Sequence, residues 1–132
     1  MPADIFVDSN IFIEIIVRTG QKTENCKKLF KKNNVSLITT AVIISEIEWV
    51  LRSHYEISKE NIIKYLEGII DLPNLTIIDR DIVESAFDIF KTKAIDWTDC
   101  LNASYCQKES IGKIYSYDKH FNKLKFLTRL EP

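Results

Sequence analysis

The stretch IFVDSNIFIE, residues 5–14, joins a short apolar strand to an apolar helix through three polar residues. Residues 5–7 are β-forming, and apolar residues recur at helical spacing from Ser9 onward. Asp8 therefore lies at a strand-to-helix junction. A carboxylate placed there is either a helix cap or a member of a charged or metal-binding site, because an unpaired buried carboxylate is costly.

The rest of the chain alternates between short strand patterns and amphipathic helical patterns. Further strands are predicted at residues 35–39, 75–78 and 113–118, and helices at 22–33, 41–55, 58–72, 79–93 and 96–110. This alternation predicts an α/β fold with a mostly parallel central sheet of about four to five strands, flanked by helices in three layers. Because no linker or repeat interrupts the 132 residues, we expect a single domain over residues 1–132.

The composition is that of an ordinary globular protein, with 45% hydrophobic and 28% charged residues and a net charge of -1. No global charge favours a nucleic-acid or membrane partner. The three cysteines lack a CxxC spacing and are expected to be free thiols in a reducing cytosol. We see no signal peptide and no apolar run of the roughly 18–20 residues that span a bilayer, so we expect a cytoplasmic protein.

Four acidic residues stand where a solvated surface would not explain them: Asp8, Glu46, Asp99 and Asp118. Asp8 and Asp118 follow predicted strands, and the carboxyl ends of parallel strands form the ligand-binding edge of a sheet. Glu46 interrupts the apolar side of a predicted helix, and Asp99 lies in the first turn of another. Clustered carboxylates suit Mg²⁺ or Mn²⁺. The pattern predicts one or two such ions and metal-assisted hydrolysis of phosphodiester bonds.

Three of these acids have a simpler alternative explanation. Asp8 could only cap a helix, Asp99 could only complement a helix dipole, and Asp118 could be a turn residue. Asp96 is expected to be the N-cap of the helix that contains Asp99.

Glu48 competes with Glu46 for the functional role on the predicted helix 41–55. Residues two apart on a helix lie on roughly opposite faces, so only one of them can face a central site. Glu48 has Arg52 at i+4 as an ion-pair partner. We therefore expect Glu48 at the surface and Glu46 in the site.

Four motifs in this order resemble a PIN domain, and most closely the VapC-type toxins of prokaryotic toxin–antitoxin pairs. They are VDSN (7–10), SEIEWVLR (45–52), DWTDCLNA (96–103) and YSYDKHFNKL (115–124). The resemblance covers essentially the whole chain. It implies a Mg²⁺- or Mn²⁺-dependent ribonuclease whose acidic pocket is formed by Asp8, Glu46, Asp99 and Asp118. Of these acids, we expect Asp8 and Asp99 to be the direct ligands. One departure is Cys100, where relatives usually carry Ala; Cys is a small apolar substitute.

Several polar residues are expected to support such a site. Asn10, Ser116 and Asp96 would orient the ligands from behind, although Asn10 and Ser116 could equally serve turns and caps. Because acids repel RNA, cationic groups must hold the flanking phosphates. The candidates near the site are Arg52, Lys119 and His120.

The tryptophans and a lysine run are further candidates for RNA contact. Lysines 22, 27, 28, 31 and 32 could bind RNA, but such a run is usually a solvated helix face. Trp97 is expected either to stack on bases or to lie in the core. Trp49 is expected in the core.

The resemblance also implies partners: a small antitoxin with a helical inhibitory segment, and a second copy of the chain in a homodimer. The apolar residues of the helices at 41–55 and 58–72 exceed the needs of one small core and favour such interfaces. An alternative function is a catalytically silent PIN-like module that binds RNA or protein. A haloacid-dehalogenase-like phosphatase is disfavoured because Asn10 stands where a second acid is needed.

Overall fold

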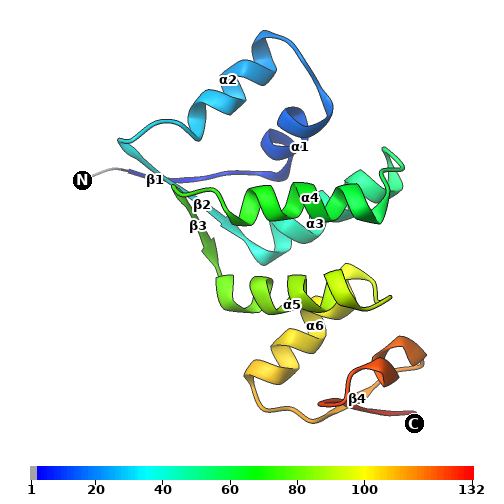
Figure 1. Cartoon of the computed structure of the whole chain (residues 1–132). Coiled ribbons are helices and arrows are strands. Elements are labelled where there is room, and N and C mark those ends of the chain that lie inside the picture. Colours follow the sequence, from blue (N-terminus) through cyan, green and yellow to red (C-terminus); the bar gives the residue numbers. More distant parts are fainter. Residues whose placement is uncertain (1–2) are drawn as a thin grey trace. The chain divides into compact units, whose positions relative to one another are not determined.

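The structure is a computed structural model that describes residues 3–132. The chain forms two compact units, the first ending at Arg80 and the second covering Asp81–Pro132. Each unit is described by itself, and Figure 1 shows the elements of both.

The first unit is built on a parallel sheet of three strands. They are β1 (Ala3–Phe6), β2 (Val35–Thr40) and β3 (Leu75–Ile78), in the order β1-β2-β3. Leu37 of β2 lies in register with Leu75 of β3. The predicted α/β class and parallel pairing are confirmed.

Two helices connect each pair of neighbouring strands, because parallel strands require a long crossover connection. α1 (Ser9–Val17) and α2 (Gln21–Leu29) follow β1, and α3 (Ala41–Ser53) and α4 (Lys59–Ile70) follow β2. The core of this unit is apolar, and its fully buried side chains include Leu37, Ile44, Ile47, Leu51 and Leu66. In this unit α1 packs against α2 and α3, and α3 packs against α4.

The second unit contains helices and a separate small sheet. Its elements are α5 (Arg80–Thr92), which begins at the last residue of the first unit, α6 (Trp97–Lys108), β4 (Lys113–Tyr115), the 3₁₀ helix η1 (Lys119–Lys123) and β5 (Thr128–Leu130). β4 and β5 pair in parallel. α5 and α6 pack through side chains that include an edge-on contact between two aromatic rings, described below.

The central sheet has fewer strands than predicted. The five strands of the described residues form one sheet of three and one of two. β4 ends at Tyr115 rather than at residue 118, and both Lys113 and Tyr115 are exposed. A strand in the middle of a parallel sheet is buried on both faces, so β4 lacks the apolar character of a central strand. β5 has only three residues and no strand pattern that would predict it.

The two tryptophans lie in opposite environments. Trp49 of α3 is 58% exposed, so the prediction that it lies in the core was wrong. Trp97 of α6 is 1% exposed, and its ring meets Phe90 edge-on at 5.6 Å between centroids. Of the two roles considered for Trp97, the structure supports core packing. Trp49 lies on the outer face of α3 although its side chain is large and apolar, so residue type was a poor guide to its burial.

All three cysteines are free. Cys26 and Cys100 are buried, and Cys106 is half-buried. The Cys100 thiol donates a weak hydrogen bond of 3.5 Å to the carbonyl oxygen of Ile95. Among residues 3–132, each helix is too short or too polar to span a membrane.

Candidate acidic site

Asp8 lies two residues beyond the end of β1, at the N-cap of α1. Its Oδ1 accepts a hydrogen bond of 2.7 Å from the backbone N–H of Ser9. The backbone N–H of Val7 donates to the carbonyl oxygen of Ile38 at 2.8 Å, which extends the pairing with β2 up to this junction. Asp8 therefore caps a helix, as one alternative predicted, and its exposed carboxylate stands at the carboxyl end of a strand.

Ser9 connects Asp8 to Glu46. Its hydroxyl donates to Oε1 of Glu46 at 2.7 Å and also lies 3.5 Å from Oδ1 of Asp8. Ser9 is buried, whereas both acids are exposed. One hydroxyl thus joins an acid at the N-cap of α1 to an acid on α3. Sequence reasoning treated Ser9 only as the start of a helix; its position between Asp8 and Asn10 was the available signal.

Glu48 is not at the surface, so that prediction was wrong. Its side chain is 3% exposed, and its carboxylate accepts from Nε of Arg52 at 2.9 Å and from Nη2 at 3.4 Å. The predicted pairing with Arg52 is confirmed. Burial removes water from the Glu48 carboxylate, and the two-pronged contact with the Arg52 guanidinium compensates for this lost hydration. Arg52, expected to hold RNA, has this ion pair on the side of α3 away from Glu46.

Asp99 and Asp118 are neighbours in the second unit. Asp99 lies in the first turn of α6 and is half-buried. Burial raises the pKa of Asp99 to about 6, with the adjacent carboxyl of Asp118 and the charge of Asp96 acting in the same direction. Two carboxyls this close favour sharing a proton over both being ionised. Asp96 occupies the N-cap position, as predicted.

Asp118 is the partner of this pair that stays ionised. Its Oδ1 accepts from the backbone N–H of His120 at 2.9 Å and lies 2.8 Å from the ring Nδ1 of His120. The backbone N–H of His120 is the main cause that lowers the pKa of Asp118. Asp118 also donates its backbone N–H to Oγ of Ser116 at 3.0 Å. His120, expected to hold RNA, and Ser116 therefore both contact this acid, while Lys119 is exposed beside it.

The structure thus brings the four acids together as two pairs, one in each unit. Within residues 3–132, no group of three or more His, Cys, Asp or Glu side chains is arranged to hold a metal ion. The donors nevertheless suit a hard cation, since all are carboxylate oxygens. The neighbouring carboxyl of Asp118 adds to burial in raising the pKa of Asp99, and a bound cation would relieve that repulsion. A common site formed by all four acids remains a prediction.

Comparisons with known proteins show what the whole chain is similar to. The family model described as PIN domain matches residues 5–127. The chain is 20% identical to "VapC ribonuclease" of Aquifex aeolicus, over 92% of this chain and 93% of that protein. It is 27% identical to "Ribonuclease VapC2" of Methanocaldococcus jannaschii, over 96% and 93%. A crystal structure of Mycobacterium tuberculosis VapC20, titled a Sarcin-Ricin loop cleaving toxin, aligns over 98% of this chain and 100% of that chain, with 13% identity and a TM-score of 0.42.

Proposed function

Because the chain belongs to the PIN domain family, we propose that it is a divalent-metal-dependent endoribonuclease and the cytoplasmic toxin of a toxin–antitoxin pair. The observation that carries the proposal is that each acid expected in the pocket has a second such acid beside it. Ser9 joins Asp8 to Glu46, and Asp99 adjoins Asp118. Two relatives that match more than nine-tenths of the chain are named ribonucleases, which supports RNA as the substrate.

The ions that suit these donors are Mg²⁺ and Mn²⁺, as one or two per site. Asp8 and Asp99 would be direct ligands, and Glu46 and Asp118 would complete the set of oxygen donors. When bound, such a cation supplies Lewis-acid assistance to phosphodiester hydrolysis.

The chain's own residues prepare the donors. The Ser9 hydroxyl fixes one oxygen of Glu46, and the backbone at His120 holds Asp118 in its ionised form. Asp99 must release its proton before it can act as a ligand. Lys119, exposed beside Asp118, is the proposed contact to a phosphate that flanks the cleaved bond.

The proposed protein partners fit two apolar features of the first unit. A cavity of about 210 Å³ between α1 and α4 is lined by Phe12, Ile15, Ile16, Lys64, Tyr65, Gly68, Ile69 and Leu72. We assign it to the apolar face of a helical antitoxin segment. Val42 and Trp49 are exposed on α3, seven residues and so two helical turns apart, and we assign them to a homodimer interface. A monomer at micromolar concentration would contradict the second assignment.

The test compares wild type with Asp8→Asn and Asp99→Asn, which keep side-chain volume but remove a charge. Each protein is incubated with a mixed pool of single-stranded and structured RNA, with Mg²⁺ or Mn²⁺ and then with EDTA. We expect cleavage by wild type that EDTA abolishes. Removal of a residue that only supports a metal ligand typically lowers activity by about 10–100-fold. Because Asp8 and Asp99 are proposed as direct ligands, each variant should lose more cleavage activity than that.

The matched control is Asp88→Asn, because Asp88 is an exposed acid on α5 that forms an ion pair with a helix neighbour, Lys91. It should cleave as wild type does. Calorimetry with Mn²⁺ distinguishes a ribonuclease tested on the wrong RNA from a protein that binds no metal. RNA binding without cleavage and without Mn²⁺ binding would replace the proposal with the silent binding module.

A further inference from the structure

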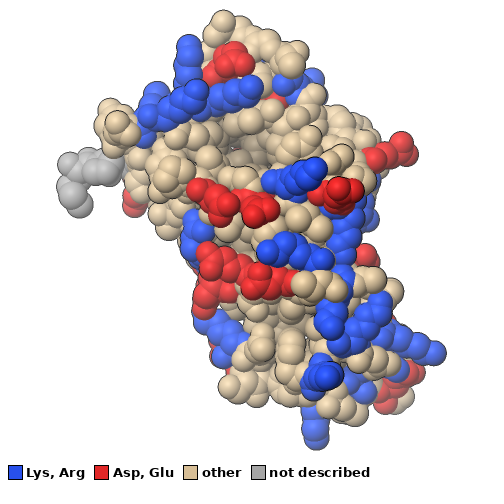
Figure 2. Space-filling model, in the orientation of Figure 1, with Lys and Arg blue, Asp and Glu red and all other residues tan. Residues whose placement is uncertain are grey.

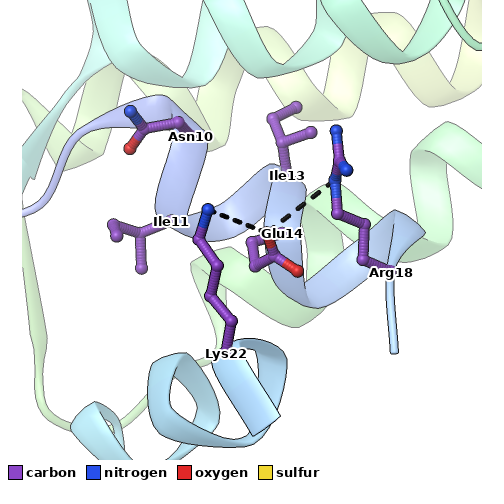
Figure 3. A pocket seen from close by; sticks show the side chains of 6 residues that line it. All are labelled: Asn10, Ile11, Ile13, Glu14, Arg18 and Lys22. Atoms are coloured by element: carbon purple, nitrogen blue, oxygen red, sulfur yellow. Dashed lines mark ion pairs between the residues drawn. The ribbon is translucent and has the colours of Figure 1, made fainter. Parts of the chain in front are cut away.

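A second cavity in the first unit is lined by none of the four acids. It has a volume of about 310 Å³ and is lined by Asn10, Ile11, Ile13, Glu14, Arg18 and Lys22 (Figure 3). Lys22 extends from the start of α2 toward α1, and Arg18 extends from the C-cap of α1. The size is at the lower end of the range for ligand sites.

Glu14 anchors this cavity. Its side chain is 10% exposed, and its Oε2 accepts from the Thr23 hydroxyl at 2.8 Å. Its Oε1 lies 3.8 Å from Nε of Arg18 and 3.8 Å from Nζ of Lys22, as the dashed lines in Figure 3 show. One buried carboxylate therefore holds two cationic side chains at the cavity.

The two cations are not neutralised by this contact. Their side chains are 62% and 86% exposed for Arg18 and Lys22, and a separation of 3.8 Å is long for an ion pair. Two positive charges against one negative charge leave an excess of one. Arg and Lys both retain N–H donors for a further acceptor. The cavity is therefore prepared for a small anionic group.

The position of the cavity relates it to Asp8. Asn10, Glu14 and Arg18 follow one another at four-residue spacing, so they share one face of α1. That face begins two residues after Asp8 and ends at Arg18, about 12 Å further along the helix axis at the α-helical rise. An RNA strand bound at Asp8 and lying along α1 would reach Arg18.

We propose that Arg18 and Lys22 bind a backbone phosphate of the RNA strand whose cleaved bond lies at Asp8, and that Glu14 holds the two cations in place. The inference rests on the proposed ribonuclease function and adds a substrate-positioning site to it. Acidic ligands repel the RNA backbone, so cations along the path of the strand are required. Arg with Lys is a pair suited to phosphate. Lys and Arg side chains also gather over α2 in Figure 2.

The experiment measures RNA binding as a function of salt, in an Asp8→Asn background that prevents cleavage. The variant is Arg18→Gln with Lys22→Gln, and the probe is the mixed RNA pool. Loss of one phosphate contact should weaken binding and reduce the slope of log affinity against log salt by about 0.7, the value per phosphate of a single strand. With Asp8 intact, the same double variant should raise KM severalfold and leave kcat nearly unchanged.

The matched control is Lys28→Gln with Lys31→Gln, which removes the same charge from two exposed lysines at and just beyond the far end of α2 that do not line the cavity. It should change the slope less. Equal losses in the two double variants would show diffuse attraction and overturn the inference, as would no loss in the cavity variant. The unfolding midpoint is measured for both double variants, because Arg18→Gln with Lys22→Gln removes the two cations beside the buried Glu14 carboxylate, and binding is compared where each variant is folded.

Two further outcomes are distinguishable. If wild type neither binds nor cleaves RNA, the proposed function fails and the inference fails with it. If RNA binding is unaffected by the cavity variant while binding of a poly-glutamate peptide is lost, the ribonuclease proposal stands and the cavity is a site for an acidic protein segment, contrary to the inference.

Discussion

Ser9 contributes one hydroxyl that contacts both acids of the first unit. Its replacement by Ala should lower the affinity for Mn²⁺ by about 10–100-fold, because outer contacts of metal ligands have effects of this size. The bond of 2.7 Å to Glu46 is lost, while the backbone N–H that Asp8 caps is retained. Isothermal titration calorimetry with Mn²⁺ measures the change.

Ser53→Ala is the control for this prediction, since Ser53 is an exposed hydroxyl at the end of the helix that carries Glu46. Affinity for Mn²⁺ should then equal that of wild type. If Ser9→Ala also binds Mn²⁺ as wild type does, the Ser9–Glu46 bond has no part in preparing the ligands.

Asp99 makes the stability of the metal-free protein depend on pH. Its pKa is raised to about 6 in the folded protein, against about 3.9 when unfolded. Between these values the folded state binds more protons, so the free energy of unfolding falls as pH rises from about 4 to about 6. Asp118, whose pKa is lowered, acts in the opposite sense only below about pH 4.

Urea unfolding in EDTA across this range measures the effect. Asp99→Asn should remove most of the decline, because Asn carries no titrating proton. Asp88→Asn, at an exposed acid, should keep it. A decline that persists in Asp99→Asn would assign the pH dependence to other groups.

Single residues also show where sequence reasoning reached its limit. Two-residue spacing correctly placed Glu46 and Glu48 on opposite faces of α3, and i+4 spacing correctly paired Glu48 with Arg52. The spacing of these residues did not reveal which face of the helix is buried, because an acid paired with Arg is found both at the surface and in the interior of proteins. Trp49 was misplaced for a similar reason: hydrophobicity favours burial on average but does not fix it for one residue.

The helices α1 and α2 are joined by a polar contact in addition to apolar packing. Thr23→Val should destabilise the first unit by about 1–3 kcal/mol, because the buried Glu14 loses the hydroxyl donor at 2.8 Å while side-chain volume is conserved. Urea denaturation followed by circular dichroism gives the change in the free energy of unfolding.

Thr23→Ser keeps the hydroxyl and should recover most of that stability. If Ser and Val were equally destabilising, the lost methyl group and altered packing would explain the result, and the hydrogen bond would not.

Elements differed in how well the sequence predicted them. The helix at 58–72 was signalled by a cap, and Ser58 does accept from the backbone N–H of Asn61 at 3.3 Å. The helix predicted at 22–33 ends at Leu29. Its C-cap residue Phe30 meets the ring of Phe12 at 5.4 Å between centroids, and the polar residues 31–34 that follow are exposed. β4 and β5 are too short for periodicity to define, and their pairing depends on contacts distant in sequence.

The whole chain raises the question of cooperativity, because its two compact units lie within one family match. We expect both units to unfold in a single transition, as a single domain over residues 1–132 would. The first unit contains Trp49 and the second contains Trp97. In the Trp49→Phe variant, tryptophan fluorescence therefore reports only the second unit, whereas far-ultraviolet circular dichroism reports the helices of both units.

Coincident urea transitions by the two probes in Trp49→Phe would support cooperative unfolding. Trp49 is a suitable position for this substitution because it is exposed and contributes little to a core. Separate midpoints would show that the units unfold independently, and the single-domain prediction would be wrong.

The free thiols give the chain a built-in set of chemical reporters. Cys26 is buried in the first unit and Cys100 in the second, while Cys106 is only partly covered. A maleimide should modify Cys106 first in the native protein, and the other two only when their own unit opens. Peptide mass mapping after brief labelling would then time the opening of each half of the chain separately, without any engineered probe.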